Sequence, residues 1–230
     1  MKKYFIITLA FISLSLSGQE QKIINTGEFT GVRCQGAATW ELIPSNECKL
    51  IIKSDNPDVY KYIHAEVQGN ILVINTTEKN KRVSKLFNSV EFLIMFKEID
   101  VIALEGAGKI ISIDTIKSEL ITASLKGSGK LDLLIDCKSF ESEIKGTSMF
   151  KVKGKANHTI IDVGGVGGFS GLEFVSESVN VKVDGVGSAY VHATEELTAV
   201  LNGVGSIKYL GSPSQKDIKV SGVGTVKPYN

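Results

Sequence analysis

A short glycine-rich phrase, Gly-x-Gly, recurs along the C-terminal half of the chain and is the first feature that could do chemistry. A glycine loop can hold a phosphate when its backbone N–H groups lead directly into a helix N-terminus. Here another alternating apolar run follows each phrase, which predicts a strand and not a helix. We therefore expect neither a nucleotide site nor any other cofactor.

Metal-binding patterns are also incomplete. The stretch from Gly164 to Phe169 is similar to a calcium-binding nonapeptide repeat, but Phe169 stands where that motif supplies a carboxylate. The three histidines, His64, His158 and His192, are far apart and fit no ligand spacing. The sequence predicts no metal site.

Carboxylates could support sugar chemistry, because β-helical polysaccharide lyases and glycoside hydrolases use them on an exposed face walled by long loops. The candidates are Asp132, Asp136, Asp162 and Asp184. The repeats around them are too uniform to provide long loops, and aspartates beside corners commonly form turns. We therefore expect no catalytic residues and keep a carbohydrate-active enzyme as the alternative.

Aromatic and cationic residues near the C-terminus indicate a binding patch instead. Tyr190, His192, Lys208 and Tyr209 are predicted to face outward and to lie near one another. Such a patch could bind a cell-surface glycan or a protein, and the same residues could also be ordinary solvent-facing strand residues.

The three cysteines are Cys34, Cys48 and Cys137. Cys34 and Cys48 could pair and would leave Cys137 over. The repeat places Cys34 at an inward position, where a buried free thiol is the simpler interpretation.

Charge and the N-terminus indicate the compartment. The chain has 26 basic and 25 acidic residues, so it offers no basic surface for nucleic acid. Two lysines precede an apolar run from Phe5 to Leu16 and small residues up to Gly18, which predicts a signal peptide over residues 1–18. This run is too short to span a bilayer. We expect an exported protein in the periplasm, at the cell surface or outside the cell, without a membrane-spanning segment.

The elements that would position these residues follow from an internal repeat. Successive copies of the phrase begin 18 to 21 residues apart, at Gly106, Gly127, Gly146, Gly165, Gly185, Gly203 and Gly222. Every residue two before and four after these glycines is apolar, as at Leu201 and Ile207. An earlier copy at Gly36 has Cys34 and Trp40 at the same two places, so the repeat begins near residue 30.

Within each unit apolar and polar residues alternate, which is typical of a half-buried strand. Units of about 19 residues match the coils of a parallel β-helix, in which stacking buries each unit's apolar row. A membrane β-barrel is disfavoured, because its strands need about 9–11 residues and these runs are shorter. The sequence predicts an all-β fold, a single β-solenoid domain over residues 19–230.

The domain has two parts. Residues 106–230 carry the regular repeats, whereas residues 37–105 are less regular and are predicted to cap one end of the solenoid. In that segment Asp55 to Tyr62 indicates a short capped helix, and Ile71 to Thr76 and Val90 to Phe96 indicate two strands. Pro228 would end pairing at the other end.

Phe29 to Val32, Gly36 to Leu42 and the later Gly-Val-Gly-Ser repeats resemble the bacterial auto-transporter adhesin, head GIN domain family, over nearly the whole predicted mature chain. The resemblance implies a right-handed, single-stranded parallel β-helix exported by Bacteroidetes-type bacteria. It implies an adhesin and no catalytic motif. We expect a non-catalytic surface-binding or structural protein, which could also form a homo-oligomer.

Overall fold

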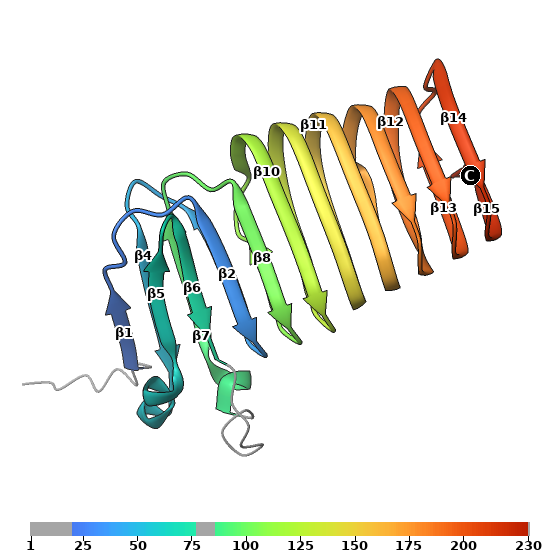
Figure 1. Cartoon of the computed structure of the whole chain (residues 1–230). Coiled ribbons are helices and arrows are strands. Elements are labelled where there is room, and N and C mark those ends of the chain that lie inside the picture. The colour runs from blue at the N-terminus through green and yellow to red at the C-terminus, as the bar shows by residue number, and fades with distance from the viewer. Residues whose placement is uncertain (1–19, 77–85, 230) are drawn as a thin grey trace, which may run out of the picture.

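The computed structural model describes residues 20–76 and 86–229. They form a β-solenoid of about seven turns, with 75% of the residues in strands. Figure 1 shows the coils stacked along one axis, from the N-terminal end to the C-terminal end. The predicted all-β repeat fold is confirmed, and the expected signal peptide over residues 1–18 lies outside the described residues.

Seven strands and two 3-10 helices build the N-terminal part: β1 (Glu20–Ile24), β2 (Gly31–Gly36), β3 (Thr39–Pro44), β4 (Lys49–Ser54), η1 (Pro57–Tyr62), β5 (His64–Gln68), β6 (Ile71–Asn75), η2 (Phe87–Ser89) and β7 (Glu91–Phe96). The C-terminal part contains β8 (Val101–Gly106), β9 (Lys109–Ser112), β10 (Ile116–Gly127), β11 (Lys130–Val183), β12 (Val186–Leu201), β13 (Val204–Leu210), β14 (Gln215–Val220) and β15 (Val223–Pro228). Strand β11 runs through successive coils without a break, because its backbone stays paired with neighbouring coils around the corners.

Successive coils pair in parallel, so the first glycines of the repeat form a column. Gly106 aligns with Gly127, and Gly127 aligns with Gly146. Gly36 aligns with Gly106, although β3 to β7 lie between them in the sequence. The predicted start of the repeat near residue 30 is confirmed, because β2 begins at Gly31.

The two predicted apolar rows form the core. The row before the glycines is buried at Leu104, Leu125, Ile144, Val163, Val183 and Leu201, and the row after them at Ile110, Leu131, Phe150, Phe169, Ala189 and Ile207. Burying one such aliphatic or aromatic side chain stabilises the fold by roughly 1.5–3 kcal/mol. The last members differ, since Val220 is 45% exposed and Val226 is only partly buried.

Close backbone approach explains why glycine recurs at the corners. A Cβ on Gly146 would lie 2.2 Å from the carbonyl oxygen of Gly127, and its φ of +109° also disfavours other residues. A Cβ on Gly187 would lie 2.1 Å from the carbonyl oxygen of Gly167. Each glycine thus leaves room for the coil before it.

The N-terminal end is covered by strands that leave the parallel pattern. Strand β6 pairs with β2, and β7 pairs with β3. The coil made of β6 and β7 therefore lies nearer the N-terminal end of the solenoid than the coil made of β2 and β3, although it follows that coil in the sequence. Antiparallel strands complete the end, β4 and β1 beyond β7 and β5 beyond β6. The predicted cap thus begins with the two parallel strands β6 and β7. Strand β3 lies within the segment expected to be irregular, but it belongs to a regular coil.

Helix η1 lies within this cap and confirms the predicted short helix. The side chain of Asn56 accepts a hydrogen bond from the Asp58 backbone N–H at 3.0 Å, and Pro57 occupies the first turn. Val59 from η1 is buried in the core. The predicted strands also form, as β6 and β7.

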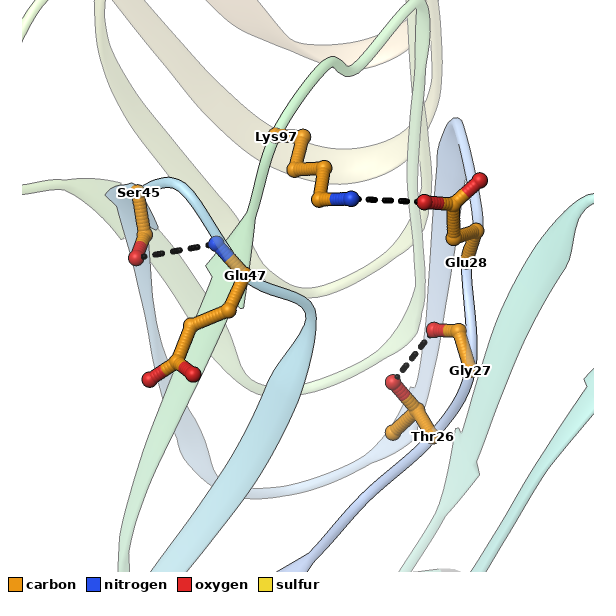
Figure 2. A network of polar contacts seen from close by, with 6 residues as sticks. All are labelled: Thr26, Gly27, Glu28, Ser45, Glu47 and Lys97. Atoms are coloured by element: carbon orange, nitrogen blue, oxygen red, sulfur yellow. Dashed lines mark hydrogen bonds and ion pairs between the residues drawn. The ribbon is translucent and has the colours of Figure 1, made fainter.

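Polar contacts hold the loops between the cap strands (Figure 2). The Nζ of Lys97 lies 2.6 Å from Oε1 of Glu28 and forms an ion pair that links two loops. This hydrogen bond and charge lower the pKa of Glu28 and raise that of Lys97. The backbone N–H of Glu47 donates to Oγ of Ser45 within a third loop.

The C-terminal end has no comparable cover among the described residues. Strand β14 pairs with β12 alone, and β15 pairs with β13 alone. Most residues of both strands are exposed. The outer edges of the last coil therefore carry unpaired backbone groups and face away from the solenoid.

Candidate ligand-binding face

Outward side chains of β12, β13 and β15 stack in columns and form one surface, named here the candidate face. Its first column contains one valine from each successive coil: Val166 of β11, Val186 of β12, Val204 of β13 and Val223 of β15. These valines are 50 to 73% exposed. At a strand spacing of about 4.8 Å, the column runs for about 14 Å.

A second column, two residues further along each strand, carries hydroxyl groups. Ser188 aligns with Ser206, and Ser206 aligns with Thr225. The Oγ atoms of Ser188 and Ser206 lie 3.2 Å apart and share a hydrogen bond. A polar row thus lies beside the apolar row on the same face.

A cluster of aromatic and cationic side chains forms the third part of the face. The Nζ of Lys208 lies 5.7 Å from the ring centroid of Tyr190 and 5.8 Å from that of Tyr229. The two rings are 5.9 Å apart and nearly perpendicular. The lysine is held against two aromatic rings, and Lys227 follows it in the same column.

His192 lies on the same strand as Tyr190 and is half-buried. Its Nδ1 is 3.1 Å from the carbonyl oxygen of Leu172. Since a carbonyl oxygen only accepts, Nδ1 carries the hydrogen in this contact.

The prediction that Tyr209 faces outward is wrong. Tyr209 is 8% exposed and belongs to the core. Successive residues of a strand point to opposite sides, so Lys208 and Tyr209 cannot share a face. Tyr229 takes the place expected for Tyr209. The alternation along the strand was the signal that could have excluded Tyr209.

The four predicted carboxylates lie at different positions of the repeat. Asp184 accepts hydrogen bonds from Lys182 and, at 2.6 Å, from Asn202, and these contacts lower its pKa. Asp136 lies 3.6 Å from Lys155. Asp132 and Asp162 are on strand β11, half-buried and exposed respectively.

Asp136 borders a surface hollow of about 580 Å³, together with Glu98, Lys117, Ser118 and Glu119. Glu119 forms an ion pair with Lys138 at 2.6 Å, and both side chains are well exposed. Glu119 and Asp136 thus each pair with a lysine at the protein surface. The hollow is a surface with alternating charges and lies on a different part of the coil from the candidate face.

Histidines and cysteines are dispersed. His64 on β5 and His158 on β11 are exposed, and no group of three or more His, Cys, Asp or Glu within residues 20–76 and 86–229 is placed to hold a metal ion. Phe169, at the carboxylate position of the calcium-like stretch, is buried.

All three cysteines are free, so Cys34 and Cys48 do not pair. The buried thiol predicted at Cys34 is confirmed, and burial raises its pKa well above the usual value. Burial, with the charge of Asp136, raises the pKa of Cys137 to about 12. Neither thiol is activated as a nucleophile at neutral pH.

The parallel coils and the stacked outer columns define a β-solenoid. The family model described as "Putative auto-transporter adhesin, head GIN domain" matches residues 28–213. The chain belongs to this family, and the resemblance noted from its sequence is confirmed.

Solved structures share the fold over nearly their whole length. A crystal structure described as a putative adhesin from Bacteroides fragilis has a TM-score of 0.86 and 25% identity, covering 93% of this chain and 98% of its own. A putative adhesin from Parabacteroides distasonis has a TM-score of 0.72 and 18% identity, covering 92% and 97%. A structure from the same species described as a putative lipid binding protein has a TM-score of 0.71 and 18% identity, covering 94% and 98%.

None of the curated proteins compared with the chain matches it. Within the described part of the chain, no helix has the length and apolar character needed to cross a membrane.

Proposed function

We propose that this chain is an exported, non-catalytic adhesin-like protein that binds a cell-surface glycan through the candidate face. The observation that carries this proposal is the cluster of Tyr190, Lys208 and Tyr229, which places one cation beside two partly exposed rings. The adhesin-head family to which the chain belongs supports the adhesin-like role.

The chemistry of the face suits a sugar ligand. Tyrosine combines an apolar ring with a polar hydroxyl, so it can contact both the C–H face and the hydroxyl groups of a sugar. Lys208 and Lys227 supply positive charge for acidic sugars, and the neighbouring serine and threonine hydroxyls can exchange hydrogen bonds with hydroxyl groups. A protein ligand that presents acidic and apolar groups is the other partner that such a face could bind.

A glycan array probed with the purified chain tests this proposal. We expect binding that falls at least tenfold in Tyr190→Ala and in Lys208→Ala, and that persists in Tyr190→Phe, which retains the ring. Lys138→Ala removes an exposed lysine from a different face and serves as the control. Equal binding by all these variants would contradict the assignment of the face.

The same array distinguishes a carbohydrate-active lyase or hydrolase from an adhesin. We expect no release of reducing sugar from any glycan that binds. If sugar were released, and if Asp136→Asn or Glu119→Gln abolished this release, the protein would be an enzyme with its active site in the hollow that these two residues border. Absence of glycan binding, with capture of a protein ligand that depends on Tyr190, would make the partner a protein.

Export and self-association are further parts of the proposal. Residues 1–18 are proposed to be removed as a signal peptide, and the mass of the protein recovered outside the cytoplasm should correspond to a chain beginning near Gln19. A homo-oligomer would present several candidate faces at once, and such multivalency raises the overall affinity for a surface without new contacts. Recovery of the full-length mass from the cytoplasm would contradict export.

A further inference from the structure

The last coil exposes the interior of the solenoid. Ile218 and Val220 of β14 are 41% and 45% exposed, whereas their register partners Ala199 and Leu201, one coil earlier, are buried. The residues are of the same apolar type and occupy the same inward positions. They are exposed because no further coil covers them within residues 20–76 and 86–229.

The outer edge of β14 is unpaired along its whole length within the described structure. An exposed sheet edge beside exposed apolar side chains is a template for pairing with another strand. Strand β15 offers a poorer edge, because Pro228 lacks an N–H group. The surface most suited to pairing is therefore β14.

We propose that two copies of this chain associate end to end by antiparallel pairing of β14 with β14 of the second copy, around a two-fold axis at Ile218. This pairing specifies the surface for the self-association proposed above. It is separate from the ligand proposal, because the candidate face and the β14 edge are changed by different substitutions.

Charge complementarity selects this register. With Ile218 opposite Ile218 of the second copy, Asp217 of each chain lies opposite Lys219 of the other, on the outward side of the sheet. In the single chain Asp217 and Lys219 form an exposed ion pair at 3.0 Å, so both groups are available on one surface. A shift of the axis to Asp217 or to Lys219, which keeps the same residues inward, would instead place that charged residue opposite its own copy. Opposite charges across a strand pair stabilise it, and like charges destabilise it.

Lys216 also explains why a closed pair is favoured over an open stack of further coils. It occupies an inward position, in register with the buried Leu197. A second copy added head to tail in parallel would place this charge within a continued core, which is unfavourable. In the antiparallel pair Lys216 lies opposite Val220 of the second copy, near the end of the contact. An isologous pair also closes, whereas head-to-tail contacts continue.

Charge reversal tests the pairing in the full chain, with mass measured by sedimentation equilibrium across a range of concentrations. We expect twice the mass of one chain at high concentration. Asp217→Lys and Lys219→Asp should each weaken association at least tenfold, because like charges then face each other. The double variant Asp217→Lys with Lys219→Asp should restore association.

Asp184→Lys is the matched control, because Lys182 and Asp184 form the same type of ion pair two positions apart on an inner coil. We expect it to leave the mass unchanged. As a second measurement, Ile218→Cys should form an intermolecular disulfide on oxidation, since antiparallel partners on the axis have Cα atoms within disulfide range. Ile113→Cys, at an equally exposed isoleucine away from the end, should not.

A wild-type chain that is monomeric at all concentrations would overturn the proposal, as would a double variant that fails to restore association while remaining folded. Association that is unaffected by both single reversals would also overturn it. A wild-type chain that binds glycan but does not self-associate would reject the pairing alone. A wild-type chain that self-associates but binds no glycan would reject the ligand proposal alone.

Discussion

Ile52 of β4 and Ile218 of β14 both lie near an end of the solenoid, yet Ile52 is buried and Ile218 is 41% exposed. Strand β4 has a neighbour on each side, β1 and β7, whereas β14 pairs with β12 alone. At the N-terminal end the coils continue into antiparallel β4, β1 and β5, and η1 contributes Val59 to the core. At the C-terminal end the repeat stops with β14 and β15 uncovered.

The difference shows that residue type does not determine burial at the end of a repeat protein. Each coil buries its apolar side chains against the coils on both sides of it. A terminal coil has only one such neighbour, so it needs a cap or a partner on the other side. The irregular N-terminal segment supplies a cap from the same chain. The regular repeats supply none within the described residues, which leaves the last apolar row for an intermolecular contact.

The largest expected contrast is between matched isoleucine truncations at the two ends. Ile52→Ala should lower the free energy of unfolding by about 2–5 kcal/mol, because it leaves a cavity in a packed core. Ile218→Ala should lower it by less than about 1 kcal/mol in dilute protein, because the side chain is already hydrated. Urea unfolding curves measure both, and equal losses would show that the two ends are equally covered.

A substitution inside the repeat should have an intermediate effect. Gly187→Val should lower the free energy of unfolding by about 1–3 kcal/mol, since its Cβ would lie 2.1 Å from the Gly167 carbonyl oxygen. Ser188→Val, at the next and outward position, should lower it by less, because it removes only the hydrogen bond shared with Ser206. A melting curve unmoved by Gly187→Val would contradict the close stacking of the coils.

The smallest expected effect concerns the ion pair in the cap. Because its folded-state pKa is lowered, Glu28 stabilises the fold above its unfolded pKa of about 4.3, and this contribution is lost as the pH falls through the lower folded value. The raised pKa of Lys97 means that the contribution is lost again as the pH rises through that value, above about 10.4.

Glu28→Gln should therefore lower the Tm slightly at pH 7 and low salt, and leave it unchanged at pH 2. Thermal unfolding of this variant and of the control Glu98→Gln, at both pH values, measures the difference. The same shift at pH 2 as at pH 7 would show that the Glu28 charge has no role.

The sequence predicted the regular coils because glycine and apolar positions stay in phase with the geometry of the stack. It also placed Gly36 in the column, which the pairing of β2 with β8 confirms. It did not predict that the β6–β7 coil lies outside the β2–β3 coil. This order depends on pairing between segments distant in sequence, and local alternation contains no information about which strand is the neighbour.

The candidate face was predicted in part. Tyr190 and Lys208 lie together on it as expected, whereas Tyr209 is buried and Tyr229 takes its place. Alternation along β13 was sufficient to exclude Tyr209. The approach of Tyr229 to Tyr190 could not be predicted in this way, because it depends on how the last coil is placed against the two before it.

Hydrogen exchange at the two ends tests the central contrast most directly. In dilute protein we expect slow exchange for backbone amides of β4 that pair with β7, and rapid exchange for the outer-edge amides of β14. Raising the protein concentration should protect β14 and leave β4 unchanged. Amides of β14 that are as protected as those of β4 at the lowest concentration would contradict an open C-terminal end.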